Sequence, residues 1–422
     1  MKHGGVRSLS TSRKMLVFHS AYIFDDLTRL GLEIFVTSRD AGEHFDRVLT
    51  VNPVASLQFP PGDSKNFTKP QFYQLDSRNV VLEGRANRFK LLNRLKALDL
   101  VIAQFSLFVT LIRKGGLRDV DLVRAEDPRF NGLYGYVLSR LLRKPLVVGV
   151  WGNPARIRKS QGVPLMPRLF PSIRSEEILE KFVLRRASIV LAQNQDNIEY
   201  AIDYGADPSK AKILPLGIGI DPAHFLPYAD RMDVSEDFKQ FGISSEFVIV
   251  CISRLEALKL VDQAVRACSV LKRANLDFKL ILIGEGRERA NLEALARELG
   301  ISNEVIFAGN RTQEWISGAL ARSHLVLAPL TGRALLETAL SGCPVVAYDV
   351  DWHGEIVRTG ETGILVENLS YEDMGEAALR LFKDESSRQK MSQNIQKLAM
   401  EMASPQVIIE MQMDIYKRLT QE

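Results

Sequence analysis

Short apolar runs bounded by turn residues recur along the whole chain, and most of them precede a stretch with helical periodicity. This alternation predicts two α/β domains, each built on a parallel sheet. The runs that we expect as strands are MLVFHS (15–20), LVRAED (122–127), LVVGVW (146–151), SIVLAQ (188–193), FVIVCI (247–252), LILIGEG (280–286), VIFAG (305–309), LVLAP (325–329) and PVVAYD (344–349).

The pattern is clearest in the second half, where helices are predicted over 261–274 and 290–300, the latter ending at a glycine. A polar segment with a proline, 224–245, is the expected linker. We therefore expect a first domain over 1–222 and a second over 223–404, with a last helix at about 405–422 packing back on the first. Because ligands of open parallel sheets bind at the carboxyl ends of the strands, two such domains facing each other would form one cleft.

Composition narrows the class of protein. The 422 residues are 46% apolar and 25% charged, which excludes a disordered, collagenous or coiled-coil chain. The apolar stretch LVIAQFSLFVTLI (100–112) is too short to span a bilayer, and we expect a packed helix there. The basic start of the chain lacks a small-residue cleavage site after its apolar run, so we expect a core strand and not a secretion signal. Three distant cysteines indicate a reducing, cytoplasmic location.

Charge divides the chain. Residues 1–222 carry 33 Lys/Arg against 22 Asp/Glu, a net of +11, whereas residues 223–422 carry 22 against 29, a net of −7. A basic half indicates an anionic partner. The segment 151–174 has basic residues and no acid, which leaves two interpretations open: a flexible basic loop, or a lip that contacts anionic lipid headgroups on the inner face of the cytoplasmic membrane. Its basic residues are Arg156, Arg158, Lys159, Arg168 and Arg174. Nucleic-acid binding is not favoured, because no aromatic platform accompanies the charge.

Three segments of the second half carry candidate chemistry for a nucleotide sugar. Gly284 and Gly286 follow a predicted strand directly, where backbone can approach a phosphate, although a plain tight turn is equally compatible. Arg254 and Lys259 lie five residues apart in one loop and suit a diphosphate, unless they are a solvated surface pair. Glu337 follows a glycine-containing turn and can hold ribose hydroxyls, unless it is a solvated helix carboxylate.

The order of motifs resembles a known family. ILPLGIGIDPAHFLP (213–227), SRLEALK (253–259), LILIGEGRERANL (280–292), VIFAGNRT (305–312), ALLETALSGCPVVA (334–347) and GETGILV (360–366) are similar to successive motifs of the retaining glycosyltransferases of group 1, glycosyltransferase family 4, which have the GT-B fold. The resemblance is continuous over about 185–400, and 121–153 is similar to the family's acceptor-domain pattern. The first hundred residues match only loosely.

The resemblance implies roles for residues of the donor side. Arg254 and Lys259 would neutralise the departing diphosphate, and Glu337, the second Glu of the family's Glu-x7-Glu motif, would hold the ribose. Asn310 and Arg311 would lie near the base. Backbone amides would contact the sugar phosphate at Gly332, Ala334, Leu335 and Leu336.

The chain also departs from the family pattern. Pro329 stands where the first Glu of the motif contacts the transferred sugar, and Leu260 replaces the usual glycine after Lys259. The Gly-Gly after the first strand and the acceptor-domain histidine are absent; Trp151 and Asn153 stand in one of those regions and are candidate acceptor-side residues.

On the acceptor side, Glu126 and Asp127 end a predicted strand, where a carboxylate can orient an acceptor hydroxyl, although an Asp-Pro pair is also typical of a simple turn. No His, Asp or Glu cluster has catalytic zinc spacing, so we expect no metal and no cofactor besides the nucleotide sugar as substrate. The expected function is transfer of a hexose-type sugar, with retention, to a carbohydrate or lipid-linked acceptor. Two alternatives stay open: a nucleotide-sugar binding protein that has lost catalysis, and a nucleotide-sugar epimerase of the same fold.

Overall fold

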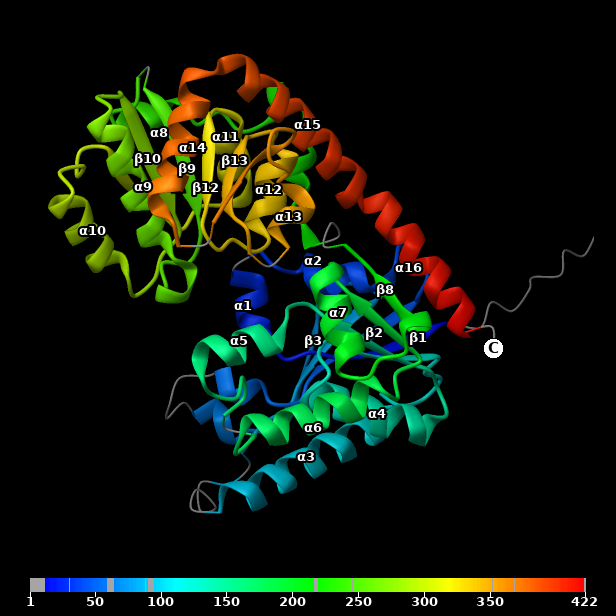
Figure 1. Cartoon of the computed structure of the whole chain (residues 1–422). Helices are drawn as coiled ribbons and strands as arrows, with labels where there is room; N and C mark the ends of the chain where they lie inside the picture. The colour runs from blue at the N-terminus through cyan, green and yellow to red at the C-terminus, as the bar shows by residue number, and fades with distance from the viewer. Residues whose placement is uncertain are drawn as a thin grey trace, which may run out of the picture. The chain divides into compact units, whose positions relative to one another are not determined.

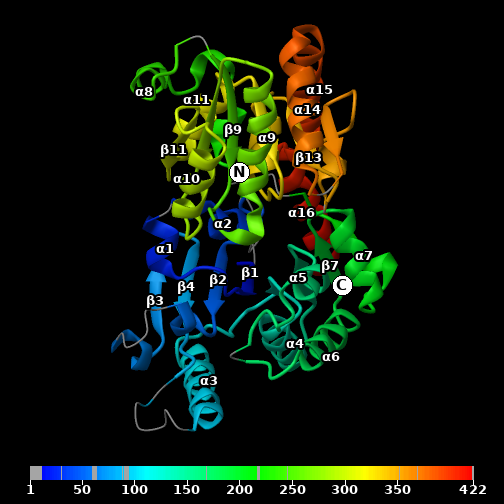
Figure 2. The same cartoon turned by 60° about the vertical axis from the view of Figure 1, so that its left-hand side comes forward.

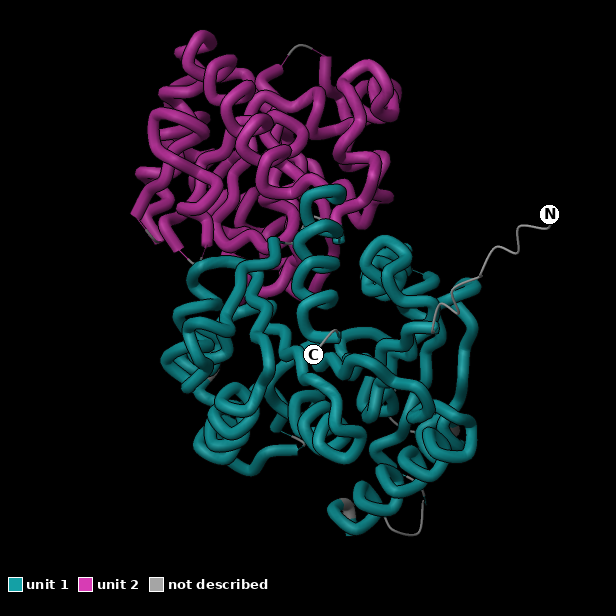
Figure 3. Tube along the Cα trace, turned by 90° about the vertical axis from the view of Figure 1, so that its right-hand side faces the viewer, with its two compact units in different colours: residues 1–219, 405–422 teal, residues 220–404 magenta. Residues whose placement is uncertain are grey.

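The computed structural model comprises two compact α/β units, whose elements are labelled in Figure 1 and seen from a second direction in Figure 2. It describes residues 12–29, 31–58, 64–87, 89, 95–167, 169–215, 219–244, 246–350, 352–367 and 369–420. Unit 1 comprises Met1–Gly219 and Pro405–Glu422, and unit 2 comprises Ile220–Ser404 (Figure 3). The chain therefore leaves unit 1 near residue 219 and returns to it at Pro405.

Unit 1 is built on an eight-stranded sheet in the order β3-β4-β2-β1-β5-β6-β7-β8, which is parallel except for the edge strand β3. Its strands are β1 (Lys14–Phe18), β2 (Arg47–Asn52), β3 (Gln71–Gln74), β4 (Asn79–Glu83), β5 (Leu122–Ala125), β6 (Leu146–Val150), β7 (Ile189–Ala192) and β8 (Ala211–Ile213). Successive residues of β1 point to opposite faces: Leu16 and Phe18 join one apolar cluster, and Met15 and Val17 join another.

Helices cover both faces of this sheet. Leu107 of α3, Leu138 of α4 and Val183 of α6 pack in the cluster of Leu16 and Phe18. Ile408 and Tyr416 of α16 pack on the opposite face. The helices of unit 1 are α1 (Phe24–Arg29), α2 (Ile34–Thr37), α3 (Lys96–Arg113), α4 (Phe130–Leu142), α5 (Pro154–Gln161), α6 (Ile173–Leu184), α7 (Gln195–Asp203) and α16 (Pro405–Thr420), with 3-10 turns η1 (Ser38–Asp40), η2 (Ala55–Gln58), η3 (Ser64–Phe67) and η5 (Pro208–Lys210).

Unit 2 has a six-stranded sheet in the order β11-β10-β9-β12-β13-β14, and its strand pairs are parallel. Its strands are β9 (Phe247–Ile252), β10 (Phe278–Ile283), β11 (Val305–Gly309), β12 (Leu325–Ala328), β13 (Val345–Tyr348) and β14 (Gly363–Val366). Ile249 and Cys251 of β9 pack against α9 and α14 in the largest apolar cluster of the unit. The helices are α8 (Ser235–Gln240), α9 (Val261–Arg273), α10 (Arg289–Glu298), α11 (Gln313–Ala321), α12 (Ala334–Leu340), α13 (His353–Ile356), α14 (Tyr371–Lys383) and α15 (Glu385–Ala403), with 3-10 turns η7 (Pro222–Phe225), η8 (Tyr228–Asp230) and η9 (Ala257–Lys259).

The predicted class, two α/β domains on parallel sheets, is confirmed, and each apolar run expected as a strand overlaps one. The expected linker at 224–245 is wrong. His224 and Arg231 are buried within unit 2, and the Arg231 guanidinium donates to the carbonyl oxygens of Leu226, His224 and Leu340. These bonds fix the segment to the unit, because a buried guanidinium must satisfy its donors.

The helix predicted at 100–112 forms as α3 (Lys96–Arg113), but one of its faces is exposed. Leu107 and Leu111 are fully buried, whereas Val101 is 64% exposed and Phe105 67% exposed. Among the described residues, no helix is both long and apolar enough to cross a membrane.

Candidate functional sites in the two units

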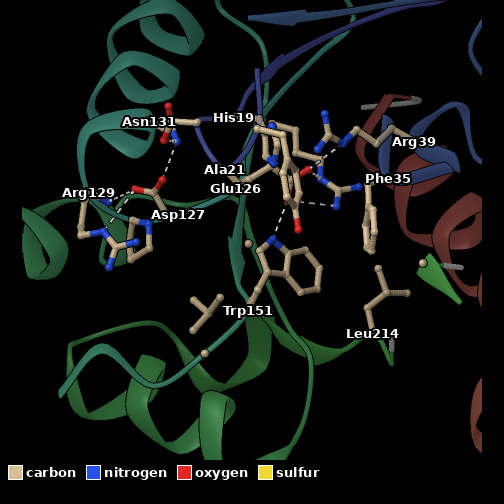
Figure 4. Close-up of a pocket in the computed structure, with 18 of the residues that line it drawn as sticks. His19, Ala21, Phe35, Arg39, Glu126, Asp127, Arg129, Asn131, Trp151 and Leu214 are labelled. Atoms are coloured by element: carbon tan, nitrogen blue, oxygen red, sulfur yellow. Dashed lines mark hydrogen bonds and ion pairs between the residues drawn. The ribbon is translucent and has the colours of Figure 1, made fainter. Parts of the chain in front are cut away.

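A cavity of about 550 Å³ lies at the carboxyl ends of β1, β5 and β6 in unit 1 (Figure 4). His19 and Ser20 follow β1, Glu126 and Asp127 follow β5, and Trp151 follows β6. The helix α16 adds Ile408 and Gln412 from the end of the chain. This is the edge at which a parallel sheet positions ligands, and the volume suits a small molecule.

A buried charge network forms one wall of the cavity. The Glu126 carboxylate lies 3.2 Å from Nε of Arg39 and 3.0 Å from Nε of Arg124, and both guanidinium groups are almost fully buried. Arg124 also donates to the hydroxyl of Tyr416 at 2.6 Å, and the Trp151 indole N–H donates to Glu126. One carboxylate therefore balances two cations, so the network carries a net positive charge.

The network sets the charge state of its neighbours. Burial acts to raise the pKa of Glu126, but Arg124 and Arg39 outweigh it and lower the pKa to about 2. Burial and the charge of Arg39 lower the pKa of His19 to about 3. At neutral pH, Glu126 is thus a carboxylate of low basicity and His19 is neutral.

Asp127 is held in a second, separate set of bonds. Its carboxylate accepts from the backbone N–H of Arg129 at 2.8 Å and from the side-chain amide of Asn131. Asn131 also donates to the hydroxyl of Ser20 at 2.8 Å, which links the ends of β1 and β5. Asp127 is thus oriented toward the start of α4, as Figure 4 shows.

The rest of the lining is mainly apolar. Phe35, Leu214 and the Trp151 ring lie around the cavity in Figure 4, and the Arg124 guanidinium stands 5.6 Å from the centre of the Trp151 ring. A cavity with aromatic walls and a few fixed polar groups suits an acceptor that has an apolar part and a polar part.

The structure brings together three of the four predicted acceptor-side residues: Glu126, Asp127 and Trp151. Asn153 instead caps α5: its side chain accepts from the Arg156 N–H at 3.3 Å and donates to Asp196 at 3.0 Å. Sequence reasoning missed Arg39, Phe35 and Gln412, which come from segments with no motif. His19 and Arg124 carried a usable signal, since both lie in predicted strand runs.

In unit 2, the loops after β9 and β10 lie backbone to backbone. A Cβ added to Gly284 would lie 2.1 Å from the Ser253 carbonyl oxygen, and one added to Gly286 would lie 2.2 Å from that of Leu255. The Leu255 N–H also donates to the Glu285 carbonyl at 3.0 Å. The two glycines are therefore required by a close approach to the loop that carries Arg254.

Arg254 and Lys259 both lie in this loop, after the carboxyl end of β9. Arg254 is exposed and Lys259 is half-buried at the end of η9. Leu260, which replaces the family's glycine, has a φ of 54° and caps α9 in the left-handed conformation. The backbone shape that glycine favours is thus kept here by a leucine, at a cost of about 1–2 kcal/mol.

Glu337 is buried on α12, with 2% of its surface exposed, and lies 2.7 Å from Nε of Arg333. The alternative of a solvated helix carboxylate is therefore excluded. Two of the amides predicted to contact the sugar phosphate donate within the chain: the Leu335 N–H donates to the Gly332 carbonyl at 3.0 Å, and the Leu336 N–H donates to that of Arg333 at 2.9 Å. The phosphate contact of this segment stays a prediction.

The two predicted base-side residues behave differently. Asn310 directly follows β11 and is exposed, beside Gly309, whose carbonyl accepts from the Gly284 N–H at 2.9 Å. The Arg311 guanidinium instead stacks on the Trp315 ring at 4.7 Å and donates to the Ala308 carbonyl at 3.0 Å. Arg311 therefore has a packing role in this structure.

A residue outside the motif set ties two of these loops together. His353 is fully buried, with Nδ1 at 2.9 Å from the Tyr348 carbonyl oxygen and Nε2 at 3.0 Å from that of Thr331. It thereby connects the loop after β13 to the loop that carries Gly332.

The basic segment 151–174 is less available than its sequence suggests. Arg158 is 3% exposed and lies 3.2 Å from Glu176 and 2.8 Å from Glu180, and Arg156 lies 2.7 Å from Asp196. The acids that neutralise them, on α6 and α7, all lie beyond residue 174, so the composition of the segment alone did not predict this pairing. Arg168 lies outside the described residues. No group of three or more His, Cys, Asp or Glu among the described residues is arranged to hold a metal ion.

The second unit is similar in sequence to a family of known proteins. Residues 233–398 match the family described as Glycosyl transferases group 1. The alpha-D-kanosaminyltransferase of Streptomyces kanamyceticus is 26% identical over 278 residues, which cover 62% of this chain and 67% of that protein. The D-inositol 3-phosphate glycosyltransferase of Nocardia farcinica is 30% identical over 234 residues, 52% of this chain and 51% of that protein, so the chain spans about half of this relative.

A solved structure matches both units. Anabaena Alr3699/HepE, in complex with UDP, aligns with a TM-score of 0.71 at 20% identity, over 96% of this chain and 100% of that one. A likeness at this identity shows the fold, which is GT-B, as the order of motifs predicted. Over residues 233–398 the second unit is thus similar to the group 1 glycosyltransferases, and the chain as a whole has the GT-B fold.

Proposed function

We propose that this glycosyltransferase moves a hexose-type sugar from a nucleoside diphosphate to a carbohydrate or lipid-linked acceptor, with retention at the anomeric carbon. The observation that carries the proposal is the arrangement of unit 2. Within the part of the chain that matches the family, the loop of Arg254 and Lys259 packs directly on the Gly284-Gly286 turn. The presence of UDP in the Alr3699/HepE structure supports a uridine donor as the first to test.

Arg254 and Lys259 would act on the leaving group. The bond between the anomeric carbon and the diphosphate oxygen breaks as the sugar gains oxocarbenium character, and two cations stabilise the charge left on the diphosphate. Glu337 is buried and charge-paired, which suits the fixed orientation that a hydrogen bond to ribose hydroxyls requires. The exposed Asn310, which follows β11, would face the base.

The cavity of unit 1 would hold the acceptor. Glu126 is a poor proton acceptor because its pKa is about 2 and its oxygens are engaged by Arg39, Arg124 and Trp151. We therefore assign it to positioning of the cavity wall. The acceptor proton would instead pass to the departing diphosphate oxygen as the new bond forms on the same face of the sugar, which yields retention.

The proposed location is the cytoplasmic side of the membrane, where a lipid-linked acceptor would be presented. No metal or further cofactor is needed in this scheme, because the two cations of unit 2 neutralise the diphosphate.

The test is release of nucleoside diphosphate from a panel of UDP- and GDP-sugars, with donor affinity measured separately. We expect turnover of at least one donor, and a loss of kcat on the order of 10²- to 10³-fold in Lys259→Ala. Glu337→Ala should weaken donor binding, whereas Arg297→Ala, which removes an exposed cation of α10, should leave both quantities unchanged. Unchanged donor binding in Glu337→Ala would show that the ribose contact is misassigned.

A second function is favoured by one observation. Pro329 stands where the family has the carboxylate that contacts the transferred sugar, so the chain would bind a nucleotide sugar without transferring it. In that case donors would raise the melting temperature of unit 2 while no diphosphate is released with any acceptor.

A further inference from the structure

The helix α3 presents an apolar stripe to solvent. The exposed large apolar side chains of α3 are Leu98 (48%), Val101 (64%), Phe105 (67%) and Ile112 (51%). At 100° per residue these four side chains fall within an arc of about 60° on the helix. The opposite side carries Ala103, Leu107 and Leu111, which are buried against the sheet.

The polar residues of α3 face the protein or its flanks. Gln104 donates to the Arg85 carbonyl at 2.8 Å and accepts from the Tyr134 hydroxyl at 2.6 Å. Asp99 is 1% exposed and accepts from the Phe89 N–H at 3.0 Å. A surface helix of a water-soluble unit normally shows the reverse order, with polar residues outward. An outward apolar stripe of this kind marks an interaction surface.

The described residues at the carboxyl end of the stripe are basic. Arg113 lies in the last turn of α3, and Lys114 and Arg118 follow it. At the carboxyl end of α3, a cavity of about 510 Å³ is lined by the cations Lys14, Arg47, Arg78 and Lys114. The described residues that line it include no carboxylate, and they include Phe72, which is 38% exposed.

The cations of this cavity differ in their protein contacts and in their exposure to solvent. The Lys14 ammonium donates to the carbonyl oxygens of Gly115 at 3.0 Å and Arg118 at 3.2 Å, which places it against the turn that follows α3. Arg78 is paired with Glu43 at 2.7 Å, whereas Arg47 and Lys114 are exposed. The cavity therefore keeps an excess of positive charge next to the apolar stripe.

We propose that α3 and the cation-lined cavity at its carboxyl end form a surface that docks on an anionic phospholipid bilayer. The stripe would enter the boundary between headgroups and acyl chains, and the cavity would take phosphate headgroups. Charge complementarity favours an anionic bilayer over a second copy of the chain as the partner of this surface. A copy related by two-fold symmetry would place the same cations opposite each other. The inference rests on the proposed function in one respect only: docking would give the enzyme access to a lipid-linked acceptor.

The experiment is flotation of the full chain with vesicles of phosphatidylcholine alone and with vesicles that also contain phosphatidylglycerol, at low and high salt. We expect the chain to float with the anionic vesicles only, and less at high salt. The double variant Val101→Ser/Phe105→Ser should lose on the order of ten-fold in binding at both salt concentrations. The double variant Lys114→Glu/Arg47→Glu should lose mainly the part of vesicle binding that high salt also removes. Val407→Ser, an exposed apolar residue on α16 at the opposite face of the sheet, is the matched control and should bind as the wild type does.

Two results would overturn the proposal. One is flotation that is absent or indifferent to phosphatidylglycerol in the wild type. The other is a wild-type mass by light scattering that exceeds one chain and falls to one chain in Val101→Ser/Phe105→Ser, which would make the stripe an interface between copies. Vesicle binding needs no catalysis, so the two proposals can fail separately. If the chain does not float but turns over a donor, only the docking surface is wrong. If it floats but turns over no donor, only the proposed function is wrong.

Discussion

At the scale of single residues, the Glu126 carboxylate of unit 1 is the shared counter-ion of two buried guanidinium groups, those of Arg39 and Arg124. Removing one partner of a buried ion pair leaves an uncompensated charge, which costs far more than the pair contributes. Glu126 thus acts as a counter-ion in the wall of the cavity and not as a base.

Glu126→Gln should destabilise unit 1 by about 3–5 kcal/mol, because both guanidinium groups lose their counter-ion. Denaturant unfolding followed by the fluorescence of Trp151, with the other tryptophans replaced by phenylalanine, reports on this unit. The matched control is Glu199→Gln, an exposed change on α7 that should stay within about 0.5 kcal/mol of the parent. Equal effects of the two substitutions would mean that the network contributes nothing.

His19 makes stability depend on pH in a definite direction. Its pKa is about 3 in the folded state against an ordinary 6.5, so below pH 6.5 the unfolded chain takes up a proton that the folded chain does not. Stability is therefore present above pH 6.5 and falls as the pH decreases toward 3. Glu126, with a pKa of about 2, adds a loss that begins only below its ordinary pKa of 4.5.

Between pH 7 and pH 5.5, the free energy of unfolding of the wild type should fall by about 1 kcal/mol more than that of His19→Gln. The comparison between the two proteins cancels the other histidines, which titrate in both. Parallel stability curves for the two proteins over this range would refute the neutral, buried state of His19.

At the scale of elements, the chain shows which features a sequence pattern can predict. The strands β9, β10, β12 and β13 are buried on both faces and read as continuous apolar runs, so they were predictable. The edge strand β3 was not, because three of its four residues are exposed and the segment QFYQ has no apolar run. Its assignment depends on pairing with β4, which is a tertiary property.

Some site residues were likewise predictable from a local sequence pattern, whereas others are placed at the site only by the fold. Glu126, Asp127 and Trp151 were found because they end buried strands, and the carboxyl ends of parallel strands converge. Arg39 and Gln412 reach the same cavity from η1 and α16, and only the folded chain brings those segments there. The burial of Glu337 was likewise undecidable from the sequence, since it depends on how α12 packs in unit 2.

The turn between β10 and α10 provides a test at this scale. Gly286→Ala should destabilise unit 2 by about 1–3 kcal/mol, because the new methyl group would overlap the Leu255 backbone. The loop of Arg254 must then shift, so donor affinity should fall as well. Gly332→Ala is the control for stability, since a Cβ there meets no atom within 4 Å. Chemical denaturation and donor titration of both variants measure the two effects, and a Gly286→Ala protein of parental stability would contradict the packing described.

At the scale of the whole molecule, the two halves of the chain carry opposite net charges and would therefore bind anionic ligands in different ways. Residues 223–422 carry a net charge of −7 yet include the loops proposed to bind a diphosphate, so the local cations Arg254 and Lys259 are needed there. Residues 1–222, with a net of +11, hold the cavity proposed for the acceptor and the basic surface beside α3.

The most direct test of the account is the anomeric configuration of the transferred sugar. The wild type is incubated with the donor that it turns over and with a panel of carbohydrate and lipid-linked acceptors, and the new glycosidic linkage is examined by proton NMR. We predict a new glycosidic bond with the configuration of the donor, and none in the Arg254→Ala/Lys259→Ala protein. A product of inverted configuration, or donor turnover that the double substitution leaves intact, would contradict the account.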